Sequence, residues 1–187
     1  DLSAKLLQET EAMSIVNDML IPALDKAGAE FEKGKLFLPQ LIQTAGTAQA
    51  CFEVIKNYIL STGEKSVSKG KIILATVKGD IHDIGKNIVK VLLENYGYTV
   101  TDLGKDVEYQ AVVDAIKEHD CQLVGLSALM TTTLGSMEDT IKLIKENNLN
   151  CKIMVGGAVL TPEYAEKIGA DFYSKDAKQS VDIAKQV

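Results

Sequence analysis

The chain has 187 residues, 46% of them hydrophobic, and a formal net charge of −6, so it can bury one substantial core, or one core and a small satellite domain. All 20 basic residues are lysines, and no basic stripe or arginine is present to neutralise phosphates or read bases, which argues against nucleic acid and anionic membranes as partners. No signal peptide opens the chain and no apolar stretch reaches the roughly 18 residues that a membrane span needs, which favours a cytoplasmic protein.

The first third of the chain, residues 1–61, is predicted to form a helical domain, because apolar residues recur near the spacing of one helix face. Pro22 interrupts this pattern, so we expect a kink or a helix boundary there. Gly34 permits a break before Pro39, and Pro39 suits the first turn of a second helix.

A polar, glycine-bearing stretch over residues 62–70 is predicted to be an interdomain linker. The chain begins with Asp1 rather than Met, so we also expect it to be a piece of a longer protein.

The remainder, residues 71–187, alternates short apolar runs with helix-like stretches. The runs occupy residues 71–77, 98–103, 122–128, 152–157 and 171–174. Near-continuous apolar strands separated by helices indicate a parallel sheet that helices cover on both faces. We therefore predict an α/β domain with a doubly wound, five-stranded parallel sheet, flavodoxin-like (Rossmann-like) in strand order, preceded by the small helical domain.

Ligands of such sheets bind beyond the carboxyl ends of the strands, where the first loop reads KGDIHDIGKN. His82 lies there between Asp80 and Asp83. A neutral imidazole is the commonest protein ligand for transition metals, and a carboxylate on its other nitrogen fixes the tautomer. Either aspartate could serve, and an exposed histidine with no ligand is as compatible with the spacing. We expect Gly79 and Gly85 to permit tight turns on either side, and a helix to begin near Gly85 with its free N–H groups open to an anion.

The loops after the third and fourth strands approach the same edge. Ser127 and the run Thr131, Thr132 and Thr133 supply hydroxyls, which would either extend a hydrogen-bond relay or cap a helix. Gly156 and Gly157 remove two β-carbons where the chain leaves the sheet, which either admits a flat ligand or permits a tight turn.

The remaining metal-ligating side chains are few. Cys51, Cys121 and Cys151 are odd in number and lack CxxC spacing, so we expect reduced packing residues rather than disulfides or a zinc site. His119, the other histidine, is expected at a helix C-terminus. If His82 binds a metal, the other ligands must therefore come from a cofactor.

These motifs resemble those of cobalamin-binding domains. DIHDIG, with Asp80, His82 and Gly85, is similar to the DxHxxG signature of that family, and SALMTTT and GGA fall where the family has its second and third binding segments. FEKGKLFLPQ resembles the cap of corrinoid methyltransferase modules. The resemblance covers essentially the whole chain and implies a cobalamin (corrinoid)-binding module of the methionine synthase or corrinoid methyltransferase type.

The resemblance implies that cobalamin binds base-off and His-on, with His82 as the lower axial ligand of cobalt. It further implies a catalytic relay in which Asp80 accepts a hydrogen bond from His82 and is held by the hydroxyl of Thr133, where methionine synthases more often have serine. The displaced nucleotide tail would enter the sheet edge. The implied cofactor-binding residues of this edge are Gly79, Asp80, Ile81, His82, Asp83, Ile84, Gly85, Ser127, Leu129, Thr131, Thr133, Gly156, Gly157 and Ala158.

The helical part is implied to shield the upper face of the cofactor, which would be methylcobalamin in the resting cycle. Phe31, Phe37, Leu38 and Leu41 match the cap positions, and ordinary helix packing is the alternative for each. The cap would have to move to expose cobalt, with the linker as the hinge.

Two functions follow from the resemblance. The first is a methyl carrier of methionine synthase type, in which partner domains pass a methyl group from methyltetrahydrofolate to homocysteine and the module alone has no complete active site. The alternative is a free-standing corrinoid protein of a methylamine or methoxy-compound methyltransferase system.

Two other classes are disfavoured. An adenosylcobalamin mutase domain shares DxHxxG, but we expect no FEKGKLFLP cap in it. A receiver domain of the same fold would need an acceptor aspartate at the end of the third strand, where this chain reads LVGLSALM.

Overall fold

A computed structural model describes residues 2–62 and 68–187 of the chain. The chain divides into two compact units, Asp1–Ser68, here the helical unit, and Lys69–Val187, here the sheet unit. Most of the predicted linker, residues 63–67, lies outside the described residues.

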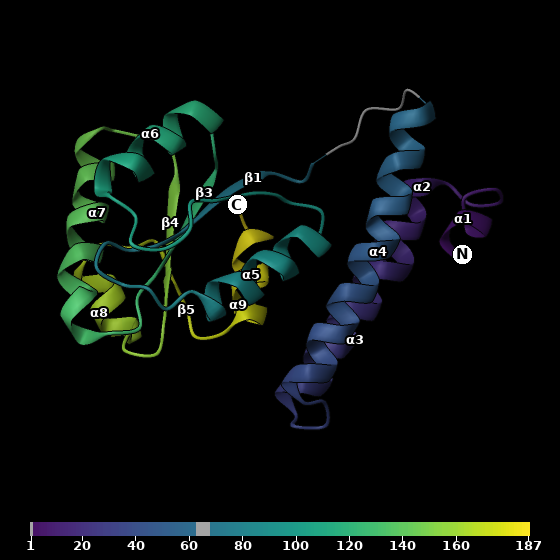
Figure 1. Ribbon diagram of the computed structural model, residues 1–187, viewed down its shortest axis with the longest axis horizontal. Coiled ribbons are helices and arrows are strands. Elements are labelled where there is room, and N and C mark those ends of the chain that lie inside the picture. The colour runs from purple at the N-terminus through teal and green to yellow at the C-terminus, as the bar shows by residue number, and fades with distance from the viewer. Residues whose placement is uncertain (1, 63–67) are drawn as a thin grey trace. The chain divides into compact units, whose positions relative to one another are not determined.

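The helical unit is built mainly from two helices that lie side by side, α3 and α4 (Figure 1). Its elements are α1 (Leu2–Leu6), α2 (Ala12–Ser14), the π-helical segment η1 (Ile15–Leu20), α3 (Ile21–Glu32) and α4 (Leu38–Thr62). Pro22 lies in the first turn of α3, directly after the π-helical segment η1, so the boundary that it marks is a change from π-helical to α-helical hydrogen bonding. Gly34 turns the chain between the two long helices with φ of +69°.

The sheet unit contains five parallel strands in the order β2-β1-β3-β4-β5. They are β1 (Lys71–Thr76), β2 (Thr99–Asp102), β3 (Leu123–Ser127), β4 (Lys152–Gly156) and β5 (Phe172–Ser174). After Lys71, every residue of β1 is buried, as expected for a central strand covered on both faces. The fold class predicted from the sequence is therefore confirmed, and each observed strand lies within its predicted run.

Five helices of the described chain follow these strands. They are α5 (Ile84–Asn95), α6 (Tyr109–His119), α7 (Leu134–Glu146), α8 (Pro162–Lys167) and α9 (Ala177–Ala184), with a short 3-10 segment, η2 (Thr131–Thr133), before α7. α5 and α9 pack together on one face of the sheet, and α6 and α7 pack together on the other (Figure 1). The main apolar core lies between the sheet and the α6/α7 layer.

The strand register aligns the carboxyl ends into one row. Thr76 is paired with Ser127, Ser127 with Gly156, and Gly156 with Ser174. The loops after β1, β3 and β4 consequently leave the sheet at the same edge, where ligands of doubly wound sheets bind.

The structure also shows where the second histidine and the three cysteines lie. His119 is the last residue of α6. All three cysteines are free thiols, and the sulfur atoms of Cys121 and Cys151 lie 3.3 Å apart. Among the described helices, none is both long enough and apolar enough to cross a membrane.

Candidate functional site

The carboxylate of Asp80 is the centre of the hydrogen-bond network at the sheet edge. Its side chain is fully buried. Oδ1 lies 3.0 Å from the backbone N of His82 and 2.8 Å from His82 Nδ1. Oδ2 accepts from the Leu129 N–H at 2.7 Å, the Met130 N–H at 3.3 Å and the Thr133 hydroxyl at 3.0 Å. The loops after β1 and β3 thus meet on one carboxylate.

This environment keeps Asp80 ionised. Burial by itself would raise the pKa of Asp80, but the hydrogen bonds from the amides of His82 and Leu129, the His82 ring and the Thr133 hydroxyl hold its pKa well below the usual range. An ionised carboxylate only accepts hydrogen bonds. The proton between the two residues therefore belongs to His82 Nδ1, and the tautomer with this proton has its lone pair on Nε2.

The His82 side chain is 44% exposed, and its Nδ1 is held against Asp80. Of the two neighbouring aspartates, Asp80 is therefore the one that bonds to the imidazole. Asp83 occupies the N-cap position of α5, where its side chain makes no capping hydrogen bond. Within the described residues, no group of three or more His, Cys, Asp or Glu side chains is arranged to hold a metal ion.

Exposed apolar side chains lie close to His82 in the chain and in the loop that bonds to Asp80. Ile81 is 61% exposed, Ile84 is 77% exposed and Leu129 is 42% exposed. Exposed large apolar side chains gathered at a strand-end edge mark an interaction site. The donor set fits a metal-containing cofactor that takes one nitrogen ligand from the protein and has apolar surface of its own.

The hydroxyls of the third-strand loop separate into two groups. Thr133 is buried, and its hydroxyl lies 2.9 Å from the Met130 carbonyl as well as 3.0 Å from Asp80. Thr131 is exposed at the start of η2. The hydroxyl of Ser127 lies 2.8 Å from that of Thr76 across the strand ends. Only Thr133 of these hydroxyls contacts Asp80 among the described residues.

The two glycines around the histidine loop have different backbone environments. Gly79 has φ of +83°, in the region that glycine favours, so a turn there is confirmed. Gly85 instead lies in the first turn of α5, and a β-carbon on it would meet no atom of the described chain within 4 Å. The helix expected to begin near Gly85 is therefore confirmed, Gly85 itself makes no separate turn, and the space beside it is open.

The glycines after β4 are required by the chain itself. Gly157 has φ of +138°, and a β-carbon on it would lie 1.8 Å from the Ala128 carbonyl oxygen. A β-carbon on Gly156 would lie 3.0 Å from the Ser174 carbonyl oxygen. These contacts explain both glycines without a ligand, because the neighbouring strand ends approach them. Ala158, the next residue, is exposed.

The predicted cap residues fall into three environments within the helical unit. Phe37 is 68% exposed and Leu38 is exposed at the start of α4, whereas Phe31 is half-buried in α3. Leu41 is buried in the helical unit, so the packing interpretation fits it better. Ile42, which was not among the predicted cap residues, is also exposed, one helical turn after Leu38.

Two further features of the site were not predicted. The backbone amides of Leu129 and Met130 hold Asp80, and backbone donors leave no signature in side-chain identity. Asp106, in the loop after β2, accepts a hydrogen bond from the Gly79 N–H at 2.7 Å. The turn-like run GKD was the only sequence signal for it.

Comparison with known protein families identifies the class of protein to which the chain belongs. Residues 70–182 match the family model described as the B12 binding domain, and residues 1–56 match a second model with the same description. The chain belongs to the B12-binding family, and its cofactor is a corrinoid.

Curated relatives give a finer class. Over 181 residues the chain is 41% identical to dimethylamine corrinoid protein 1 of Methanosarcina acetivorans, covering 96% of this chain and 84% of the relative. Over 191 residues it is 34% identical to a corrinoid protein of Desulfitobacterium hafniense, covering 100% of this chain and 88% of the relative.

Solved structures agree with this class. A cobalamin-binding protein from Desulfitobacterium hafniense matches with a TM-score of 0.84 and 32% identity, covering 99% of this chain and 88% of that one. A chain of the methanol:cobalamin methyltransferase complex of Methanosarcina barkeri matches with a TM-score of 0.85 and 27% identity. The match covers 99% of this chain and 70% of that one. The chain is therefore a corrinoid protein of methyltransferase systems, and its partners are methyltransferases.

These relatives correct the first of the two expected functions. They support the alternative, a corrinoid protein of a methylamine system, and give no support to a methionine synthase module with folate and homocysteine domains or to a role in methionine biosynthesis.

Proposed function

We propose that this protein is the corrinoid methyl carrier of a methylamine methyltransferase system, and that the amine is dimethylamine. One methyltransferase would load a methyl group from the amine, and a second would remove it to an acceptor. The observation that carries this proposal is the 41% identity to a dimethylamine corrinoid protein over 96% of the chain, which spans both units.

In this proposal His82 is the lower axial ligand of the corrinoid. Its side chain is 44% exposed, and the buried Asp80 carboxylate engages Nδ1 at 2.8 Å, which leaves Nε2 as the nitrogen for the metal. A carboxylate on the second nitrogen orients the ring and raises its basicity. The cobalt of the bound corrinoid supplies the atom that accepts and releases the methyl group, and the methylated cofactor would be the resting form.

Thr133 and the loop amides position Asp80. The Thr133 hydroxyl and the amides of Leu129 and Met130 all point at Oδ2, which leaves Oδ1 for the histidine. The carboxylate is therefore held in place before a ligand arrives, and the ring needs little reorientation when it binds cobalt.

The remaining edge residues would hold the rest of the cofactor. Ile81, Ile84 and Leu129 offer apolar contact around the histidine, and the open space beside Gly85 leaves room for a ligand. Ser127, Thr131 and the segment Gly156 to Ala158 border the same edge. In the helical unit, we propose that Phe37, Leu38 and Ile42 form the apolar surface that keeps water from the upper face, with Phe31 behind them.

The axial ligand can be tested directly. Protein labelled with nitrogen-15, loaded with unlabelled hydroxocobalamin and reduced to Co(II), should give an electron paramagnetic resonance spectrum with superhyperfine splitting from one nitrogen-15. His82→Ala should lose this splitting. His119→Ala is the matched control, because it removes the other histidine and should keep it. Splitting from unlabelled nitrogen in the wild-type protein would mean that the cofactor's own base stays on cobalt, and would overturn the proposal.

The methyl donor requires a separate assay. The loaded protein, reduced to Co(I), should be methylated from dimethylamine in the presence of a dimethylamine methyltransferase. The change in the visible spectrum measures the reaction. Methanol with its own methyltransferase and methyltetrahydrofolate with a folate methyltransferase are the comparison reactions. Methylation from either of these and not from dimethylamine would reject the proposed system.

A further inference from the structure

The loop after β2, residues 103–108, runs beside the loop that carries Asp80 and His82. The N–H of Val107 donates to the Thr76 carbonyl at 3.1 Å, and the Thr76 N–H donates to the Gly104 carbonyl at 3.0 Å. Val77 and Val107 form an isolated parallel bridge. The pairing between these two chain segments thus continues beyond the end of β2.

Asp106 makes two contacts across this pairing. Its N–H donates to the Asp80 carbonyl at 2.9 Å, and its Oδ1 accepts from the Gly79 N–H at 2.7 Å. Asp106 has φ of +54° and Gly79 has φ of +83°. Aspartate is one of the few residues besides glycine that adopts this left-handed conformation at modest cost. One residue therefore directs its amide and its carboxylate at two consecutive residues.

These contacts complete the backbone hydrogen bonding of Asp80. Its N–H donates to the Val77 carbonyl at 3.0 Å, and its carbonyl accepts from Asp106. With both groups engaged, the direction in which the Asp80 side chain leaves the backbone is fixed. That side chain in turn holds His82 through the two bonds to Oδ1.

We propose that Asp106 is a positioning residue for the axial histidine, acting through Gly79 and Asp80 without contacting the cofactor. This inference rests on the proposed role of His82 as the lower ligand. Its energetic content is the anchoring of the Gly79 N–H by a side-chain oxygen of residue 106. Leaving such a donor without its acceptor weakens a linked equilibrium about tenfold.

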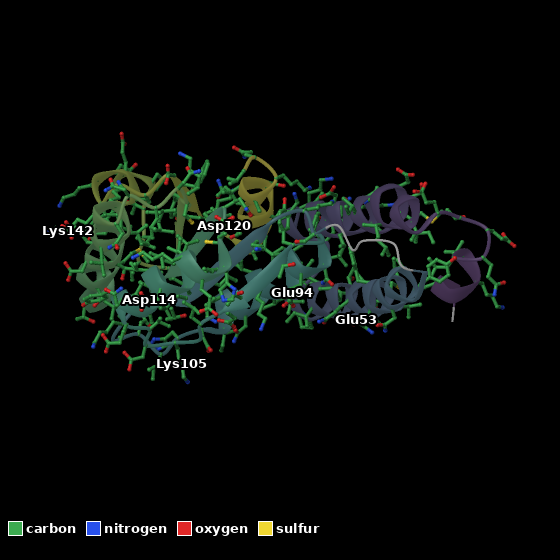
Figure 2. All side chains as sticks on the ribbon, turned by 90° about the horizontal axis from the view of Figure 1, so that it is seen from above. Glu53, Glu94, Lys105, Asp114, Asp120 and Lys142 are labelled. Atoms are coloured by element: carbon green, nitrogen blue, oxygen red, sulfur yellow. The ribbon has the colours of Figure 1, made fainter. Side chains whose placement is uncertain are left out.

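Two substitutions separate the carboxylate from the backbone conformation. Asp106→Gly keeps the left-handed conformation and removes the acceptor, whereas Asp106→Asn keeps both the conformation and an amide oxygen that accepts from Gly79. Lys105→Ala is the control, because Lys105 is an exposed neighbour at the outer edge of the sheet unit (Figure 2).

The test is a double-mutant cycle on the Kd for hydroxocobalamin, measured by equilibrium dialysis. Asp106→Gly should raise Kd about tenfold when His82 is present and should leave Kd unchanged in the His82→Ala background, because the positioned ligand is already gone. Asp106→Asn should restore most of the affinity, and Lys105→Ala should match the wild type.

The outcomes distinguish this inference from the proposed function. If His82→Ala keeps the nitrogen-15 splitting, the axial role of His82 fails and the inference fails with it. If His82→Ala loses the splitting but Asp106→Gly raises Kd equally in both backgrounds, Asp106 only supports the fold, and the inference alone is rejected. It is also rejected if Asp106→Gly binds as tightly as the wild type.

Discussion

The ammonium of Lys86, on α5, contacts the carboxylate of Asp102 at the end of β2, and the Lys86 side chain is only 2% exposed. The same carboxylate accepts from the Gly104 N–H at 2.9 Å, and the ammonium of Lys90 lies 3.7 Å from Oδ2. A buried charge is tolerated only when it is paired. The pair therefore fastens the first turn of α5, which directly follows the histidine loop, to the edge of the sheet.

This pair predicts a pH dependence of stability. Burial alone would raise the pKa of Asp102, but the hydrogen bonds from Lys86 and Gly104 and the charges of Lys86 and Lys90 lower it. A carboxyl with a lower pKa in the folded state contributes stability that is complete above its unfolded pKa of about 4. That stability is lost as the pH falls through the folded pKa. Asp102→Asn should lower the free energy of unfolding by about 3 kcal/mol at pH 7, and by progressively less below about pH 4.

Urea unfolding followed by tyrosine fluorescence measures this difference, because every tyrosine except Tyr58 lies in the sheet unit. Asp114→Asn, on the exposed face of α6 (Figure 2), is the control and should change the free energy of unfolding by less than about 0.5 kcal/mol. An equal loss for Asp102→Asn at pH 7 and pH 3 would contradict the assigned ion pair.

Gly157→Ala should strongly destabilise the sheet unit. Its β-carbon would overlap the Ala128 carbonyl oxygen, and its φ of +138° is strained for any other residue. We expect a loss of about 4 kcal/mol or more in urea unfolding, or no folded protein. Gly135→Ala is the matched change in α7, where nothing lies within 4 Å, and should raise stability by up to about 1 kcal/mol. Equal stability of the two variants would refute the close approach at Gly157.

Substitutions of Thr133 test the hydrogen bond that its hydroxyl donates to the buried carboxylate of Asp80. Thr133→Val removes the hydroxyl that lies 3.0 Å from Asp80 and should cost about 2 kcal/mol of unfolding free energy. Thr133→Ser keeps the hydroxyl and loses only a methyl group, so its cost should be about 1 kcal/mol. The same urea assay compares them, and a valine variant as stable as the serine variant would show that the hydroxyl contributes nothing.

Ile84 tests the apolar surface around His82. Ile84→Gln should leave the unfolding free energy nearly unchanged, because the side chain is 77% exposed. If a corrinoid covers this surface, the substitution should raise the Kd for hydroxocobalamin about tenfold. Val187→Gln, another exposed apolar residue, is the control and should bind as the wild type does. Unchanged binding by Ile84→Gln would place the corrinoid elsewhere.

The thiols of Cys121 and Cys151 should oxidise selectively as a pair. Their sulfur atoms lie 3.3 Å apart, and the hydrogen bond between them lowers the pKa of Cys121 and raises that of Cys151, which keeps its proton. Diamide should take one hydrogen from each thiol, become a hydrazine and leave a disulfide. Peptide mass mapping should find this crosslink and find Cys51 still reduced. A crosslink that includes Cys51 would contradict the pairing.

The sequence by itself determined the architecture and the location of the site. Five near-continuous apolar runs predict buried parallel strands, and the loops that follow such strands must share one edge. His82 between two aspartates, directly after the first run, was therefore recognisable as a ligand candidate. These inferences depend on local periodicity and on a general rule of topology, both of which a single chain displays.

Only the tertiary structure decided how the site is held together. It selected Asp80 over Asp83, because amides and a hydroxyl from the loop 49 to 53 residues further along converge on Asp80 alone. It placed Leu41 in the interior of the helical unit and Ile42 on its surface. It also explained Gly157 by the carbonyl of Ala128 and brought Asp106 to Gly79 across 27 residues. Such contacts depend on loop conformations and on backbone groups, which every residue carries and which sequence patterns therefore do not record.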